Sequence, residues 1–68
     1  MIEKKFYGER LRIARMYRGL TLTELAKRTE ISKQSISLYE NDNNTPDYMK
    51  VRLLASELNF PYDYFFQK

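Results

Sequence analysis

Apolar residues recur at helical spacing along most of the chain. The first such stretch consists of Phe6, Leu11, Ile13, Ala14 and Tyr17. Basic residues fill the positions between them, so the pattern is that of an amphipathic helix with one apolar face. It predicts a helix from about residue 6 to 18. Gly19 follows as a C-terminal cap that tolerates a positive φ.

Two capping signals predict a pair of short helices in the middle of the chain. Thr21 and Glu24 are spaced as in a capping box, which predicts a helix over about 22–29. Ser32 is a favoured N-cap residue and predicts a further helix over about 33–40. Because only two residues separate these helices, we expect them to cross steeply. The inward residues of the pair are expected to be Leu25, Ala26, Ile36 and Tyr39.

The rest of the chain predicts a loop and two more helices. Asn and Asp dominate residues 41–44, and both types favour turns. Pro46 and Asp47 then mark the start of a helix over about 48–58. Its apolar stripe consists of Val51, Leu54, Ala55 and Leu58. Asn59 suits the position after that helix, and a last short helix is expected over about 62–66. The pattern predicts a single all-α domain over residues 1–68, built from five helices.

Composition narrows the chemistry that this domain can perform. The 68 residues contain neither Cys nor His, so we expect no disulfide and no structural zinc site. The usual nucleophile and base pairs of hydrolases are missing too. We therefore expect no cofactor, no metal and no enzymatic activity. No apolar run approaches the roughly 18 residues of a membrane span, and no secretory signal is evident, so a cytoplasmic location is expected.

Charge is unevenly distributed along the sequence. Residues 1–34 hold nine of the twelve Lys and Arg residues but only four of the nine Asp and Glu residues. A basic half of this kind suggests a polyanionic partner such as nucleic acid. The alternative is an ordinary solvated surface, and charge alone does not separate the two interpretations.

The segment between Leu20 and Pro46 has a specific order of features. Leu25-Ala26 is followed by a turn at Glu30-Ile31, by the run from Ser32 to Asn41 and by Pro46. Further matching residues are Arg10-Leu11, Arg15 and Gly19-Leu20 before this segment, and Leu54-Ala55, Leu58 and Phe65-Phe66 after it. Together these features resemble the phage repressor and Cro-type helix-turn-helix family, the xenobiotic-response-element-like regulators, over about residues 7–66. The resemblance implies a compact lambda-repressor-like fold, with the helix-turn-helix at the second and third helices.

The resemblance also implies a function. It predicts a sequence-specific regulator of transcription, bacterial or phage-encoded and acting as a repressor, that reads a palindromic operator on double-stranded DNA with its third helix. The alternative that we retain is an antitoxin or a protein-interaction adaptor on the same fold. Duplex binding that weakens steeply with salt separates the two, because only a DNA reader releases counterions from phosphates.

Three positions depart from the family pattern. The family usually has Gly where Glu30 stands, and a non-Gly residue in the left-handed region costs about 1 kcal/mol. We therefore expect the turn there to differ slightly in geometry. Leu22 replaces a Gln that commonly touches phosphate or braces the recognition helix, a contact that Leu cannot make. Asp42 replaces a Gly in the following loop and is expected to bring a negative charge near the DNA backbone.

The third helix supplies the candidate base-reading residues. An α-helix about 10–12 Å across fits a major groove about 12 Å wide, and residues at its N-terminal end read the bases. Lys33 suits guanine, Gln34 suits adenine, and Leu38 suits the thymine methyl. The candidate phosphate ligands are Thr21, Thr23, Ser32, Ser35, Ser37, Asn43 and Asn44. The alternative for the base-reading residues is an ordinary solvated surface. The alternative for the phosphate ligands is that they serve only as helix caps and turn residues.

By resemblance, Arg15 and Glu40 form an ion pair that joins the first helix to the end of the third. Such a pair would fix the direction in which the recognition helix points. Arg10, Arg12 and Arg18 are weaker candidates for DNA contact, and a solvated face is the favoured interpretation for them.

Specific binding by one short helix usually requires two copies on a palindrome. We therefore expect a homodimer, at least on DNA. The candidate surface for self-association, or for docking of another domain, consists of Met49, Leu53, Phe60, Tyr64 and Phe66. The aromatic ending also resembles regulators in which a further C-terminal domain follows, so an additional domain or protein partner is a second expectation.

Overall fold

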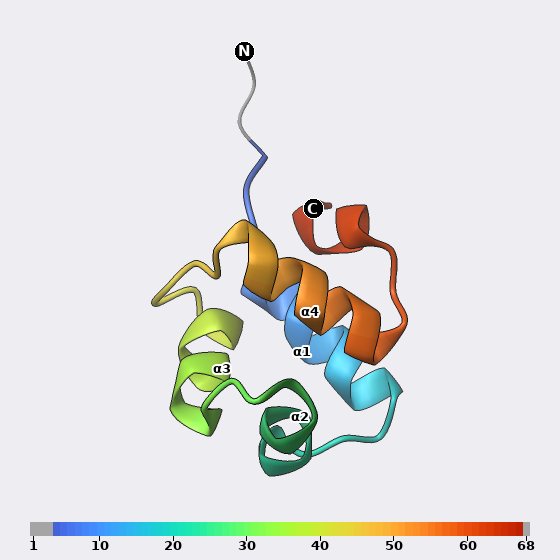
Figure 1. Cartoon of the computed structure of the whole chain (residues 1–68). Helices are drawn as coiled ribbons and strands as arrows, with labels where there is room; N and C mark the ends of the chain where they lie inside the picture. Colours follow the sequence, from blue (N-terminus) through green and yellow to red (C-terminus); the bar gives the residue numbers. More distant parts are fainter. Residues whose placement is uncertain (1–3, 68) are drawn as a thin grey trace.

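The computed structural model describes residues 4–67 (Figure 1). Its elements are α1 (Gly8–Tyr17), α2 (Leu22–Thr29), α3 (Lys33–Glu40), α4 (Tyr48–Leu58) and a 3-10 helix, η1 (Tyr62–Phe66). Within the described range there is no strand, so the all-α class predicted from the sequence is confirmed. The last element is a 3-10 helix, not an α-helix, as suits a five-residue piece that starts after Pro61 without a side-chain cap.

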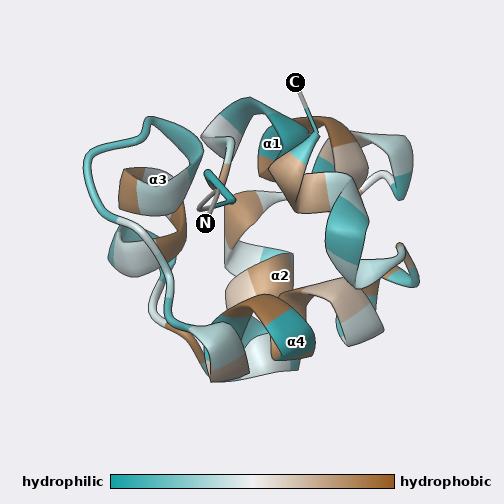
Figure 2. Cartoon of the chain, turned by 90° about the horizontal axis from the view of Figure 1, so that it is seen from above, coloured by the Kyte–Doolittle hydropathy of each residue, from teal (hydrophilic) through white to brown (hydrophobic). Residues whose placement is uncertain are grey.

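The four α-helices and η1 enclose one hydrophobic core. Its largest fully buried side chains are Phe65, Leu11, Leu25, Ile36, Leu54, Leu58 and Val51. Burial of one such side chain contributes about 1.5–3 kcal/mol, so the core draws stability from every element. In Figure 2 the loop joining α3 to α4 is coloured hydrophilic almost throughout, in contrast to the mixed colouring of the helices. The predicted inward residue Ala26 is only half-buried, although it packs against the core.

The first helix begins at Gly8 and ends at Tyr17, one or two residues inside the predicted range of about 6–18. Phe6 belongs instead to an extended segment that packs on η1. Its ring stacks on that of Phe65 with centroids 6.2 Å apart, and the Tyr7 N–H donates to the Phe65 carbonyl at 2.9 Å. These contacts with the far end of the chain hold residues 4–7 outside the helix.

Two residues of the predicted apolar face of α1 lie on its surface. Ile13 is 44% exposed and Tyr17 is 73% exposed, whereas Leu11 and Ala14 are buried. Each residue turns the helix by about 100°, so Ile13 stands about 200° from Leu11 and points away from the core. The ring of Tyr17 instead meets the edge of Phe60, with centroids 5.9 Å apart.

The turn between α2 and α3 has the left-handed conformation in spite of its non-Gly residue. Glu30 has φ 59° and ψ 21°, so the expectation of a different geometry was wrong. Its N–H donates to the Ala26 carbonyl at 2.8 Å, and Ile31, the next residue, is buried in the core. These contacts offset the conformational cost of about 1 kcal/mol.

Candidate nucleic-acid interface

The start of each helix in the α2–α3 pair is fixed by a hydroxyl side chain. Thr21 Oγ1 accepts from the Glu24 N–H at 3.0 Å, and Glu24 Oε1 accepts from the Thr21 N–H at 2.8 Å, which is the predicted capping box. Ser32 Oγ accepts from the Ser35 N–H at 3.0 Å and so caps α3. The two helices run in clearly different directions (Figure 1).

Buried Thr29 holds the turn between these helices, and the sequence analysis missed it. Its hydroxyl donates to the Leu25 carbonyl at 2.9 Å and accepts from the Ile31 N–H at 3.2 Å. One side chain therefore ties the end of α2 to the entry of α3. A Thr just before the two-residue turn was the signal that could have identified it, because Thr readily bonds to nearby backbone.

The predicted base-reading residues share one exposed surface. Lys33 and Gln34 form the first turn of α3, and Leu38 lies one turn further on. Both Lys33 and Gln34 are exposed, and within residues 4–67 neither side chain makes a hydrogen bond or an ion pair. Together with Leu22 and Ser37 these three residues line a shallow depression between α2 and α3. We call it the α2–α3 depression.

The electrostatics at the start of α3 favour an anion. The first turn of the helix contains Lys33 and no acidic residue. The positive end of the helix dipole and this ammonium group therefore act in the same direction. The acidic residue at the start of α2, Glu24, is occupied by the capping box. The carboxylate of Glu24 accepts a hydrogen bond from the Thr21 backbone N–H. This bond, and next the one with the Thr21 side chain, holds the pKa of Glu24 below its ordinary value.

Three of the seven predicted phosphate ligands, Thr21, Ser32 and Ser35, already use their side chains in hydrogen bonds within the protein. Thr21 and Ser32 serve as caps, and the Ser32 hydroxyl also donates to Ser35 Oγ at 2.9 Å. Ser35 and Ser37 are half-buried, while Thr23, Asn43 and Asn44 are exposed. The N–H groups of Asn43 and Asn44 both donate to the Leu38 carbonyl, at 2.9 and 3.3 Å, which closes the C-terminal end of α3. Their exposed side chains lie outside these backbone contacts.

Arg15 and Glu40 form a two-pronged ion pair between α1 and the end of α3. Arg15 Nε donates to Glu40 Oε2 at 2.6 Å, and Nη2 donates to Oε1 at 3.1 Å. The side chains are only 13% and 4% exposed. Arg15 Nη1 also donates to the Leu20 carbonyl at 2.8 Å, and Arg12 Nε lies 3.7 Å from Glu40 Oε1. The buried carboxylate is thus held by two guanidinium groups, and α3 is fastened to α1 beneath its exposed face.

Asp42 has a role that the sequence analysis did not predict. Its backbone is left-handed, with φ 59°, and its Oδ1 accepts from the Gly8 N–H at 2.8 Å. The carboxylate therefore caps the start of α1, which has no cap of its own. The expectation that Asp42 would place its charge near the DNA backbone overlooked this use.

Gly8 is required at the first position of α1, because a Cβ on this residue would lie 2.1 Å from the Tyr39 carbonyl oxygen.

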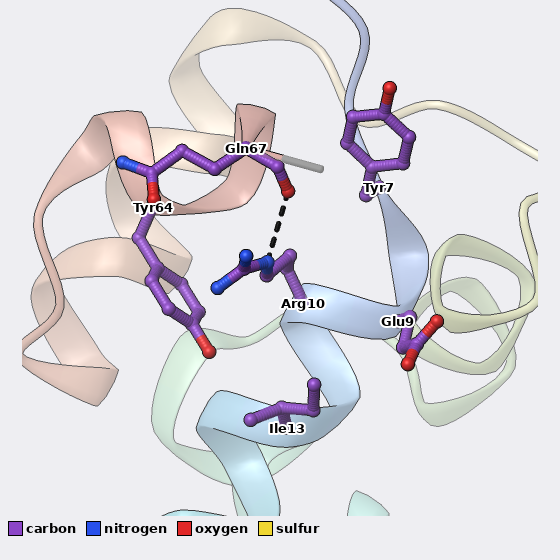
Figure 3. A pocket seen from close by; sticks show the side chains of 6 residues that line it. All are labelled: Tyr7, Glu9, Arg10, Ile13, Tyr64 and Gln67. Atoms are coloured by element: carbon purple, nitrogen blue, oxygen red, sulfur yellow. Dashed lines mark hydrogen bonds between the residues drawn. The ribbon is translucent and has the colours of Figure 1, made fainter.

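The other arginines of α1 and its C-cap pack against the second half of the chain, so a simple solvated face describes them poorly. Arg10 Nε donates to the Gln67 carbonyl at 2.9 Å, and its guanidinium lies 4.7 Å from the Tyr64 ring centroid (Figure 3). This contact forms one side of a hollow between α1 and η1, which Tyr7, Glu9, Ile13 and Gln67 also line. Arg18 donates to the Leu58 and Asn59 carbonyls at 2.7 and 3.0 Å, at the C-terminal end of α4.

The candidate association surface divides into two parts. Met49 and Leu53 lie one turn apart on α4 and are 71% and 39% exposed. Phe60, Tyr64 and Phe66 are half-buried and pack on one another or on neighbouring rings. The exposed part of this candidate surface therefore lies on α4, where Tyr48 is exposed beside Met49.

Comparison with known proteins identifies the arrangement. Residues 8–68 match the helix-turn-helix domain family. The P22 c2 repressor, solved with a synthetic operator, is 25% identical with a TM-score of 0.84, over 93% of this chain and 96% of that one. The restriction-modification controller protein C.AhdI from Aeromonas hydrophila is 24% identical with a TM-score of 0.82, over 87% and 89% of the two chains.

A longer regulator shares the same domain. An HTH_3 family transcriptional regulator from Vibrio cholerae is 29% identical with a TM-score of 0.79 over 87% of this chain, which spans only 33% of that protein. The search of curated proteins gave no match. None of the helices described here has the length and apolarity needed to cross a membrane. The chain belongs to the helix-turn-helix domain family, as a DNA-binding domain related to phage and bacterial repressors.

Proposed function

We propose that this domain is a transcriptional repressor that reads a palindromic operator by placing α3 in the major groove of duplex DNA. The carrying observation is the exposed start of α3, where Lys33 and Gln34 extend without an intramolecular partner among residues 4–67. In this family of folds the N-terminal residues of the second helix of the pair contact base edges. A Lys donates to guanine O6 or N7, and a Gln pairs with adenine N6 and N7.

The surroundings of α3 support the same assignment. Hydroxyl and amide side chains suited to phosphate oxygens lie on α3 and on the segments around it. They belong to Thr21, Thr23, Ser32, Ser35, Ser37, Asn43 and Asn44. The Ser35 hydroxyl accepts from the Ser32 hydroxyl and retains its own O–H for a phosphate. The Arg15–Glu40 pair holds α3 against α1, so the reading residues approach the groove on a rigid support.

Binding as a homodimer follows from the small size of the reading surface. Two copies on one face of the duplex require half-sites about 10–10.5 base pairs apart. The exposed α4 residues Met49 and Leu53 are the apolar surface that we assign to contact with a second copy. The same surface favours a second candidate function, a protein-interaction adaptor, in which α4 binds another protein and α3 reads nothing.

Selection of bound duplexes from a random pool tests the proposal. The wild-type domain is expected to enrich a palindrome, and the Lys33→Ala/Gln34→Ala double variant is expected to lose it while retaining weak, salt-sensitive binding. Lys4→Ala is the matched control, because it removes one positive charge from the N-terminal segment, at the end of the molecule away from α2 (Figure 1). Enrichment that is absent in the wild type, or unchanged in the double variant, would refute reading by α3.

Salt dependence separates the two candidate functions. For a DNA reader, log K falls by about 0.9 per neutralised phosphate for each unit of log salt concentration. If the domain is an adaptor, Met49→Asp would weaken the binding of its partner protein to α4. Such an adaptor would show no duplex binding that falls steeply with salt. Sedimentation with and without the selected duplex then reports whether two copies bind together.

A further inference from the structure

Leu22 stands at the first position of α2, directly beside the reading surface. It is half-buried and packs against the core, while its exposed part lines the α2–α3 depression. Leu38, 38% exposed, lines the same depression from α3. Two aliphatic side chains from different helices therefore flank a depression that also contains Lys33, Gln34 and Ser37.

We propose that Leu22 and Leu38 together form an apolar site for the 5-methyl group of one pyrimidine in the operator. The inference rests on the proposed function and deepens it, because it makes Leu22 a specificity-determining residue. The methyl is the one apolar group that a base pair presents in the major groove, and it comes from thymine or from 5-methylcytosine. Both sources offer the same group to the site.

The placement of Leu22 suits this role. The capping box at Thr21 fixes the backbone of the first turn of α2, and the contact with the core restricts the side chain. A preorganised apolar wall loses little side-chain entropy when a methyl arrives. Leu38 lies on the same face of α3 as Gln34, one turn later, so a base read by Gln34 and a methyl against Leu38 are adjacent in the groove.

The polarity of the depression argues against a phosphate in this position. A Leu has no hydrogen-bond donor, and a phosphate placed against it would lose solvation without a partner. Lys33 and Ser37 supply the polar edge, so the leucines are the part that matches an apolar group. The observations therefore favour a base edge as the occupant.

The test uses the selected operator in which the methyl group of one base at a time is removed or added. Each thymine in turn is replaced by uracil, which removes only the methyl. For the wild type we expect one position per half-site at which affinity falls roughly three- to fivefold, the effect of removing one buried methyl group. In a parallel arm each cytosine is replaced by 5-methylcytosine, and a gain of similar size at one position would identify that base as the source.

Variants assign the effect to the two leucines. Leu22→Ala and Leu38→Ala should each abolish the methyl effect at the same base. Leu22→Gln is the second variant at this position, and circular dichroism of every variant establishes that it is folded. Lys33→Ala is the matched control: it should lower affinity for the operator equally with and without the methyl group, and so leave the methyl effect in place.

The outcomes separate the inference from the function that it rests on. If no duplex is selected, both fail. If an operator is bound tightly but no thymine or cytosine shows a methyl effect, the methyl site is refuted and the reading by α3 stands. A methyl effect that survives in folded Leu22→Ala or Leu22→Gln would also refute the role of Leu22.

Discussion

Replacing Arg15 with Met should cost this domain much of its stability. The change leaves the Glu40 carboxylate, 4% exposed, without its two-pronged partner. Removing one member of a buried pair typically costs about 3–5 kcal/mol, because the remaining charge is desolvated without compensation. Arg12 Nε lies 3.7 Å from the same carboxylate and would compensate in part, so the lower end of that range is expected.

This loss is a large part of the total free energy of unfolding of the domain. Natural domains hold roughly 0.05–0.15 kcal/mol per residue, so a chain of 68 residues has about 3–10 kcal/mol in total. Arg15→Met should therefore populate the unfolded state measurably. Urea unfolding at pH 7, followed by circular dichroism, gives the change in midpoint and slope.

A double variant distinguishes the buried charge from simple loss of packing. Arg15→Met/Glu40→Leu removes both charges, and it should be more stable than Arg15→Met alone. Lys4→Met serves as a control, because it breaks the exposed pair with Asp63 and should cost no more than about 1 kcal/mol. Equal losses for Arg15→Met and Lys4→Met, or a double variant as unstable as the sum of its parts, would refute the reasoning.

Further predictions concern backbone positions and helix caps. Gly8→Ala should destabilise by roughly 2–4 kcal/mol, because the new Cβ meets backbone oxygens and displaces a hydrogen-bonded amide. Gly19→Ala, which has φ 70° but open space, should cost only about 1 kcal/mol, and equal losses in urea unfolding would contradict the packing argument. Glu30→Gly should stabilise by roughly 0.5–1 kcal/mol in the same assay, and a loss would show that the left-handed turn carries no strain. Backbone hydrogen bonds lower the pKa of Glu24 and of Asp47. Each carboxylate therefore adds stability above its unfolded-state pKa, and that stability is lost as pH falls below about 4. The urea midpoint should fall less between pH 7 and pH 3 in Glu24→Gln than in the wild type.

Local signals in the sequence predicted the helix pair well, because the determinants of its ends lie within three residues of each other. The cap at Ser32 and the capping box at Thr21 have the predicted geometry. The bounds of α4 equal the predicted ones for a similar reason, since Asp47 caps its start and Asn59 takes the left-handed conformation after its end.

The errors arose where a distant segment decides the local structure. The start of α1 depends on Asp42, 34 positions away, and on the packing of Phe6 against η1. No local pattern contains that information. The role of Leu22 was likewise hidden, because only the packed helices bring it beside Leu38.

The joint between residues 4–7 and η1 has a consequence for the order of folding. Lys4 and Asp63 are 59 positions apart, yet their side chains lie 3.0 Å from each other, close to the Tyr7–Phe65 backbone bond. Closing so long a loop costs entropy before any contact repays it, whereas α2 and α3 meet after a two-residue turn. We expect the helix pair to form first and the joint to close last. Amide exchange at Tyr7 would then be faster than at Leu25, because the joint opens while α2 and α3 stay folded.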